Sequence, residues 1–115
     1  MTRIVEAIPH LHDARLLSFS MQWRAGVLTL DFLLVGEDEL DLRVVLHGIT
    51  GIYCPREHPW GGPAPYVNEV LQPDVVPEQG DVLALEMQSG DVLRFVFESF
   101  ELLRLDLTLA SEPTP

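Results

Sequence analysis

Apolar and polar residues alternate with a period of two over most of the first half of the chain. Apolar side chains occupy every second position in residues 17–23, 28–34 and 40–46. This pattern is typical of strands that have one buried face and one solvated face. Residues 25–26 and 36–39 separate the runs and predict turns. We therefore expect an antiparallel meander, whose inward-facing residues are Leu17, Phe19, Met21 and Trp23, then Leu28, Leu30, Phe32 and Leu34, then Leu40, Leu42, Val44 and Leu46.

The second half repeats the alternation after two irregular stretches. Residues 83–87 and 93–97 alternate around a turn at 89–90, and a last run at 103–109 follows. That run predicts inward positions for Leu103, Leu105, Leu107 and Leu109. Residues 66–72 fit a short strand or a helical turn, because periodicity cannot decide between them. A segment rich in proline and glycine at 54–65 predicts a long loop.

Two such sheets, each with one apolar face, can bury those faces by packing on each other. The sequence therefore predicts an all-β fold: an antiparallel two-sheet sandwich or a partly open barrel of about seven strands. We expect one domain over residues 1–115, with residues 110–115 as a polar tail. Residues 27–32 resemble residues 82–87, and a similar run follows each. This likeness fits either an internal duplication or the ordinary resemblance of two amphipathic hairpins.

The chain of 115 residues (12.9 kDa) is too short for a TIM barrel or a kinase. Eighteen acidic residues and seven basic ones give a net charge of -11, and all seven basic residues are arginine. The absence of lysine excludes Schiff-base chemistry and a phosphate-loop lysine. The charge argues against nucleic-acid binding. It would attract a basic protein or a cation, or it serves solubility alone.

Cysteine usage and hydropathy bear on location. The single cysteine, Cys54, excludes an internal disulfide. An acid, Glu6, stands where a signal peptide has its apolar run, and no stretch reaches the length of a membrane span. The sequence therefore predicts a cytoplasmic protein with no membrane association.

His10, His12 and Asp13 form the first candidate site. Two histidines two positions apart on an extended segment point the same way and could both bind a metal, with Asp13 as a further ligand or orienting group. Asp13 could equally serve as a turn or helix cap. We predict no cofactor, but a metal-dependent hydrolase using these three residues is an alternative function. Cys54 and His58 could likewise form a zinc pair or a nucleophile and base, although an incidental cysteine at a strand end fits better.

Two further segments are candidates for partner binding. Trp60 and Tyr66 flank a loop of prolines and glycines, and these residue types dominate binding hot spots. Trp60 could also fold back and plug one end of the sandwich. The acidic cluster Glu37, Asp38 and Glu39 is either a solvated turn or a steering patch for a basic partner.

Residues 12–17 (His-Asp-Ala-Arg-Leu-Leu), followed by alternating strands, resemble the start of small bacterial β-rich proteins. That group includes immunity proteins of polymorphic toxin systems and families of unknown function. Residues 93–100 resemble their late hydrophobic strand. The resemblance implies a non-catalytic fold that neutralises a toxin by binding, and it assigns no functional residue.

Together these features predict a non-enzymatic bacterial binding or interaction protein with a basic protein partner, and an immunity-type protein that neutralises a basic toxin by binding is one form of it. Binding of a small ligand or lipid between the sheets is a further alternative. Exposed sheet edges also predict self-association as a homodimer.

Overall fold

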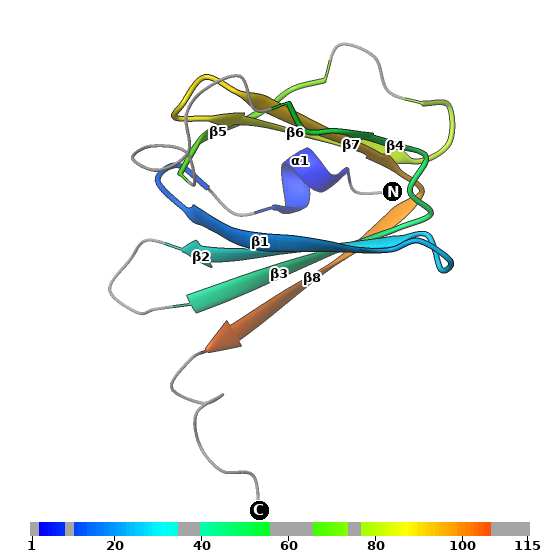
Figure 1. The fold of residues 1–115 in the computed structure, drawn as a ribbon, viewed down its shortest axis with the longest axis horizontal. Coiled ribbons are helices and arrows are strands. Elements are labelled where there is room, and N and C mark those ends of the chain that lie inside the picture. Colours follow the sequence, from blue (N-terminus) through cyan, green and yellow to red (C-terminus); the bar gives the residue numbers. More distant parts are fainter. Residues whose placement is uncertain (1–2, 9–10, 35–39, 56–65, 74–76, 107–115) are drawn as a thin grey trace, which may run out of the picture.

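A computed structural model describes residues 3–8, 11–34, 40–55, 66–73 and 77–106. These residues form one short helix and eight strands (Figure 1). The elements are α1 (Ile4–Ala7), β1 (Arg15–Gln22), β2 (Val27–Leu34), β3 (Leu40–His47), β4 (Gly51–Tyr53), β5 (Val67–Leu71), β6 (Asp81–Met87), β7 (Val92–Phe97) and β8 (Ser99–Asp106).

The strands form two four-stranded antiparallel sheets that face each other, as Figure 1 shows. The first has the order β1-β2-β3-β8 and the second the order β4-β7-β6-β5. The described strands do not close into a barrel, and one isolated bridge, Arg15 to Tyr66, links the sheets at one corner. The all-β sandwich predicted from the alternation is therefore confirmed.

The core lies between the sheets and is built largely from the predicted alternating positions of β2, β3, β6 and β7. Leu28, Leu30 and Phe32 of β2 are fully buried. The fully buried residues of β3 and β6 are Leu42, Val44, Leu46, Leu83 and Leu85. Phe95 and Phe97 supply aromatic side chains from β7, and Phe97 packs edge-on against Phe100 of β8. Because one continuous cluster of buried residues draws on both sheets, neither sheet could bury its apolar face alone.

The topology repeats itself once along the chain. β1, β2 and β3 form a meander, and the next strand, β4, pairs with the other sheet. β5, β6 and β7 form a second meander, and β8 returns to the first sheet. Both crossings lie at the same end, where the Glu98 N–H donates to the His47 carbonyl over 2.9 Å. The similar segments 27–32 and 82–87 thus occupy equivalent strands, β2 and β6, as an internal duplication would place them.

The eight described strands agree with the prediction of about seven, and the short helix α1 was not among the predicted elements. The three residues of β4 are too few to show an alternation, and residues 66–72 contain the strand β5 rather than a helical turn. The single turn α1 has no side-chain cap from its own flanking residues. Its stabilising partner comes from a distant strand, so local sequence signals could not indicate it.

Two predicted faces were wrong. On β8, Phe100 and Leu102 pack against the core, whereas Leu103 is 45% exposed on the outer face. On β1 the register shifts between Leu16 and Ser18, so Leu16 packs inward and Leu17 is exposed. Trp23, predicted inward, follows the end of β1 and is 82% exposed.

Candidate binding site at the open side of the sandwich

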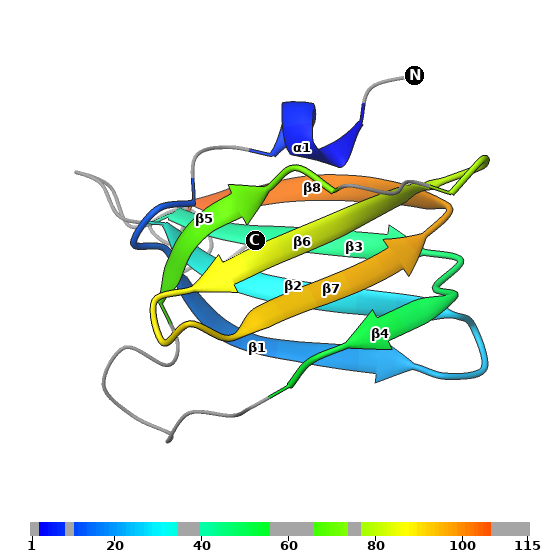
Figure 2. The same ribbon diagram turned by 90° about the horizontal axis from the view of Figure 1, so that it is seen from above.

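One lateral side of the sandwich is closed by the helix. Figure 2 shows α1 beside β6 and β8, and the Ile4 and Ile8 side chains are buried in the core there. The buried Asp81 carboxylate holds the helix in place, because it accepts a 2.6 Å hydrogen bond from the Ile4 N–H and a 3.4 Å contact from Arg3 Nε. A carboxylate at the first turn of a helix satisfies an amide that has no partner within the helix.

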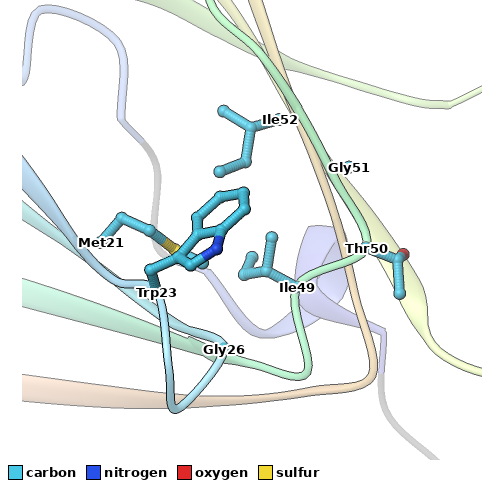
Figure 3. Close-up of a pocket in the computed structure, with 7 residues that line it drawn as sticks. All are labelled: Met21, Trp23, Gly26, Ile49, Thr50, Gly51 and Ile52. Atoms are coloured by element: carbon cyan, nitrogen blue, oxygen red, sulfur yellow. The ribbon is translucent and has the colours of Figure 1, made fainter.

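The opposite lateral side, between the edge strands β1 and β4, has no such cover among the described residues. A pocket of about 430 Å³ opens there. Figure 3 shows the Ile49 and Ile52 side chains directed toward the Trp23 indole, with Met21 on its other side. The pocket is lined by Met21, Trp23, Gly26, Ile49, Thr50, Gly51 and Ile52. We call this surface the open-side groove.

Large apolar side chains around the open-side groove are exposed to solvent. Trp23 is 82% exposed, Phe19 46% and Ile52 40%, although the Phe19 ring contacts Phe95 edge-on at 6.4 Å. Trp23 lies in the turn after β1, beyond the pleat of the strand, and β4, the edge strand of the second sheet that faces β1, has only three residues. Clustered exposed apolar side chains are typical of interaction sites.

The local charge at the groove differs from that of the whole molecule. Residues 14–30 contain two arginines and no acid, and residues 48–55 contain no charged residue. These two segments form the strands and turns that border the groove, although the whole chain has a net charge of -11. Acidic groups begin at its margin, because the Glu98 side chain packs against Gly48. The groove is therefore an apolar, acid-free surface within an acidic protein.

His12 and Asp13, predicted as metal ligands or a cap, lie at a different corner. The His12 ring bonds to the Asn68 carbonyl through Nδ1 over 2.7 Å, and the Gln88 side chain donates to the Asp13 carboxylate. Asp13 has a positive φ of 67° and donates its N–H to the Val67 carbonyl. These contacts tie the segment before β1 to β5 and to the turn after β6.

Metal-binding clusters are missing from the part of the chain that the structure describes: no three His, Cys, Asp or Glu side chains gather there. His10 lies outside the described residues, as do His58, Trp60 and the cluster Glu37, Asp38 and Glu39. Tyr66 is 37% exposed and forms the bridge to Arg15 at the corner of the sandwich. Tyr66 therefore does not line the open-side groove.

Cys54 follows β4 and is half-buried against the core. Burial raises the pKa of the Cys54 thiol, because the charged thiolate is less well solvated there. A raised pKa disfavours the thiolate that a nucleophile or a zinc ligand requires. The environment thus fits the predicted role as a small apolar residue at a strand end.

Sequence reasoning missed Trp23 and Ile52 as site residues. Strict alternation assigned Trp23 to the core, although it stands immediately before the turn at Ala25 and Gly26. A tryptophan placed there has left the strand and need not follow its pleat. The absence of acids from residues 14–30 was a second signal, visible in the sequence itself.

Comparison of the chain with family models, curated proteins and solved structures found no match in any of the three. The described helix is also too short to cross a membrane.

Proposed function

We propose that the protein is a non-enzymatic protein-binding module that holds an extended, apolar segment of a basic protein in the open-side groove. The observation that carries the proposal is the exposure of Trp23 beside Ile49 and Ile52 on a surface without acids. Tryptophan anchors in apolar pockets contribute disproportionately to protein–protein affinity.

The free edge of β1 supports an extended partner segment. In its described pairings, β1 is hydrogen-bonded along one edge to β2, and the bridge at Arg15 occupies only its start. An added strand can satisfy the amides and carbonyls on the other edge, while its alternate side chains enter the groove. Affinity would then come from main-chain hydrogen bonds and from burial of the Trp23 and Ile52 side chains.

The charge of the protein supports a basic partner. A net charge of -11 raises the rate at which a positively charged protein encounters this one. After the encounter, basic residues beside the docked segment would reach acids at the margin of the groove, such as Glu98. An immunity-type role, in which the partner is a basic toxin, is the biological form that the resemblance of residues 12–17 and 93–100 favours.

A small apolar ligand is the less favoured occupant. The pocket volume of about 430 Å³ falls within the range of ligand sites. Such sites enclose most of their ligand, however, and this one opens to solvent along β1, where a strand edge invites a chain rather than a compact molecule.

Fluorescence of Trp23 tests the proposal directly. The probe is a synthetic peptide with an alternating valine–threonine core and lysines at both ends, titrated into the Trp60→Phe variant so that Trp23 alone reports. We expect a saturable blue shift, because docking transfers the exposed indole out of water. Added salt should weaken binding, and the same peptide with glutamates at its ends should bind more weakly.

Two variants give matched controls. Ile52→Asp puts a charge into the groove and should reduce peptide affinity at least tenfold, which corresponds to about 1.4 kcal/mol. Leu103→Asp places the same charge on the outer face of β8, at a residue of similar exposure (45% against 40%), and should leave affinity unchanged. Equal binding by wild type and Ile52→Asp would contradict the groove as the site, and stronger binding of the glutamate peptide would contradict the basic partner.

A further inference from the structure

The chemistry of β1 identifies a second partner for its free edge. We infer that two copies of the chain pair antiparallel through residues 18–22 of β1, with Ser20 at the two-fold axis, and so join their first sheets into one eight-stranded sheet. The dimer itself does not depend on the proposed binding function.

Residues 18–22 form the regular part of the free edge of β1. The bulge between Leu16 and Ser18 and the bridge at Arg15 disturb the strand before this stretch, and Trp23 begins the turn after it. The edge carries none of the usual protection against strand addition, because residues 18–22 contain no proline and no charged residue.

The other described edges are protected. β4 has only three residues and is followed by Pro55. β5 carries the exposed Glu69, and β8 carries Glu101 and Arg104, both exposed. The edge of β1 thus differs from the remaining edges in having neither charge nor proline nor short length.

The sequence of this stretch is complementary to itself. Residues 18–22 read Ser-Phe-Ser-Met-Gln, so polar and apolar positions are symmetric about Ser20. With Ser20 opposite its own copy, Phe19 lies opposite Met21 and Ser18 opposite Gln22. Paired residues of antiparallel strands point to the same face. Phe19 and Met21 therefore meet on the inner face, where sulfur–aromatic contact is favourable, and the polar side chains meet outside.

Electrostatics favours this edge over contacts through the acidic surfaces of two copies. Each copy carries a net charge of -11, so association through an acidic surface is opposed by repulsion. The acid-free segment 14–30 lets the chains approach without placing carboxylates opposite each other.

Pairing of two copies and binding of the proposed partner segment compete for one edge. In the register that pairs Ser20 with Ser20, the second copy occupies the free edge of β1 to which the extended partner segment would add. The partner segment therefore binds the single chain, and the dimer is the form of the protein without its partner. This competition rests on the proposed function.

Analytical ultracentrifugation of charge variants tests the pairing. We expect wild type to sediment at twice 12.9 kDa and Ser20→Asp at 12.9 kDa, because the variant puts two carboxylates face to face across the axis. Ser20→Arg should also be monomeric for the same reason. An equal mixture of Ser20→Asp and Ser20→Arg should restore the dimer, since each aspartate then faces an arginine.

The control is Ser99→Asp, which makes the same change on the opposite edge of the same sheet and should leave the dimer intact. A wild-type monomer at all concentrations, loss of the dimer in Ser99→Asp instead, or a mixture that stays monomeric would each overturn the inference. Peptide binding by a monomeric wild type would refute the dimer and leave the proposed function standing. A wild-type dimer whose monomeric Ser20→Asp variant fails to bind the peptide would leave the dimer standing and contradict the proposed function.

Discussion

The Asp81 carboxylate and the backbone N–H of Ile4 lie 2.6 Å apart although 77 residues separate them in sequence. This contact joins the start of α1 to the start of β6 and closes one side of the sandwich. The same carboxylate accepts a 2.8 Å hydrogen bond from the Val82 N–H. One buried acid thus orders the terminal helix, while the equivalent side between β1 and β4 has no described counterpart.

Asp81→Ala should release the helix. The substitution leaves the Ile4 amide and Arg3 without their acceptor, and we expect a loss of about 2–3 kcal/mol of unfolding free energy. Denaturant unfolding measures this loss, and hydrogen exchange should localise it to residues 4–8. Asp91→Ala, which removes another buried acid far from α1, is the control for the helix-specific effect. Unchanged exchange at Ile4 in Asp81→Ala would contradict the role of the carboxylate.

Gly80 and Gly26 provide a matched test of backbone constraint. Both have positive φ, but a Cβ at Gly80 would clash with the Phe97 carbonyl oxygen, whereas a Cβ at Gly26 would meet nothing within 4 Å. Gly26→Ala should therefore lower the free energy of unfolding by about 1–2 kcal/mol, the usual cost of a left-handed conformation. Gly80→Ala adds a clash with the backbone, and we expect it to lower the free energy of unfolding by more than about 3 kcal/mol. Thermal melting of the two variants measures the difference, and equal melting temperatures would show that the clash relaxes freely.

The sequence predicted the central strands well because their alternation is unbroken. Leu28, Leu30 and Phe32 are buried as expected, and β2 and β3 pair without any register shift. The prediction failed for α1, because the helix depends on Asp81, a contact with a distant strand that leaves no local pattern in the chain. It failed for Trp23 because this residue lies in the turn after β1, where the alternation of the strand no longer applies.

The error on β8 has a local cause. Leu102 and Leu103 are adjacent, so the run can be read with either leucine inward. The structure selects Leu102, because pairing with β3 places Phe100 opposite Leu46 and Leu102 opposite Val44, both of which are fully buried. The start of the strand at Ser99 therefore sets the face, and that start follows from the crossing at Glu98.

Serine substitutions at this pair test the assignment of faces. Leu102→Ser removes apolar contacts from the core and should lower the free energy of unfolding by about 2 kcal/mol or more. Leu103→Ser changes an exposed side chain, so its free energy of unfolding should stay within about 0.5 kcal/mol of wild type. Urea unfolding of both variants gives the comparison. A larger loss for Leu103→Ser would mean that the strand presents its other face to the core.

Alkylation of Cys54 should depend on pH in a direction fixed by its burial. Burial raises the pKa of the thiol, so in the folded protein the rate of reaction with iodoacetamide should reach half its maximum above the ordinary value of 9.0. In urea the pH at half-maximal rate should fall back toward that value.

Because the pKa of the Cys54 thiol is higher in the folded than in the unfolded protein, the neutral thiol stabilises the fold fully below the unfolded pKa. That contribution is lost as pH rises through the folded pKa. Cys54→Ser should therefore lose less stability than wild type between neutral and strongly alkaline pH. Fast alkylation of folded protein at neutral pH would instead indicate an activated thiolate, and with it the nucleophile that the geometry around Cys54 disfavours.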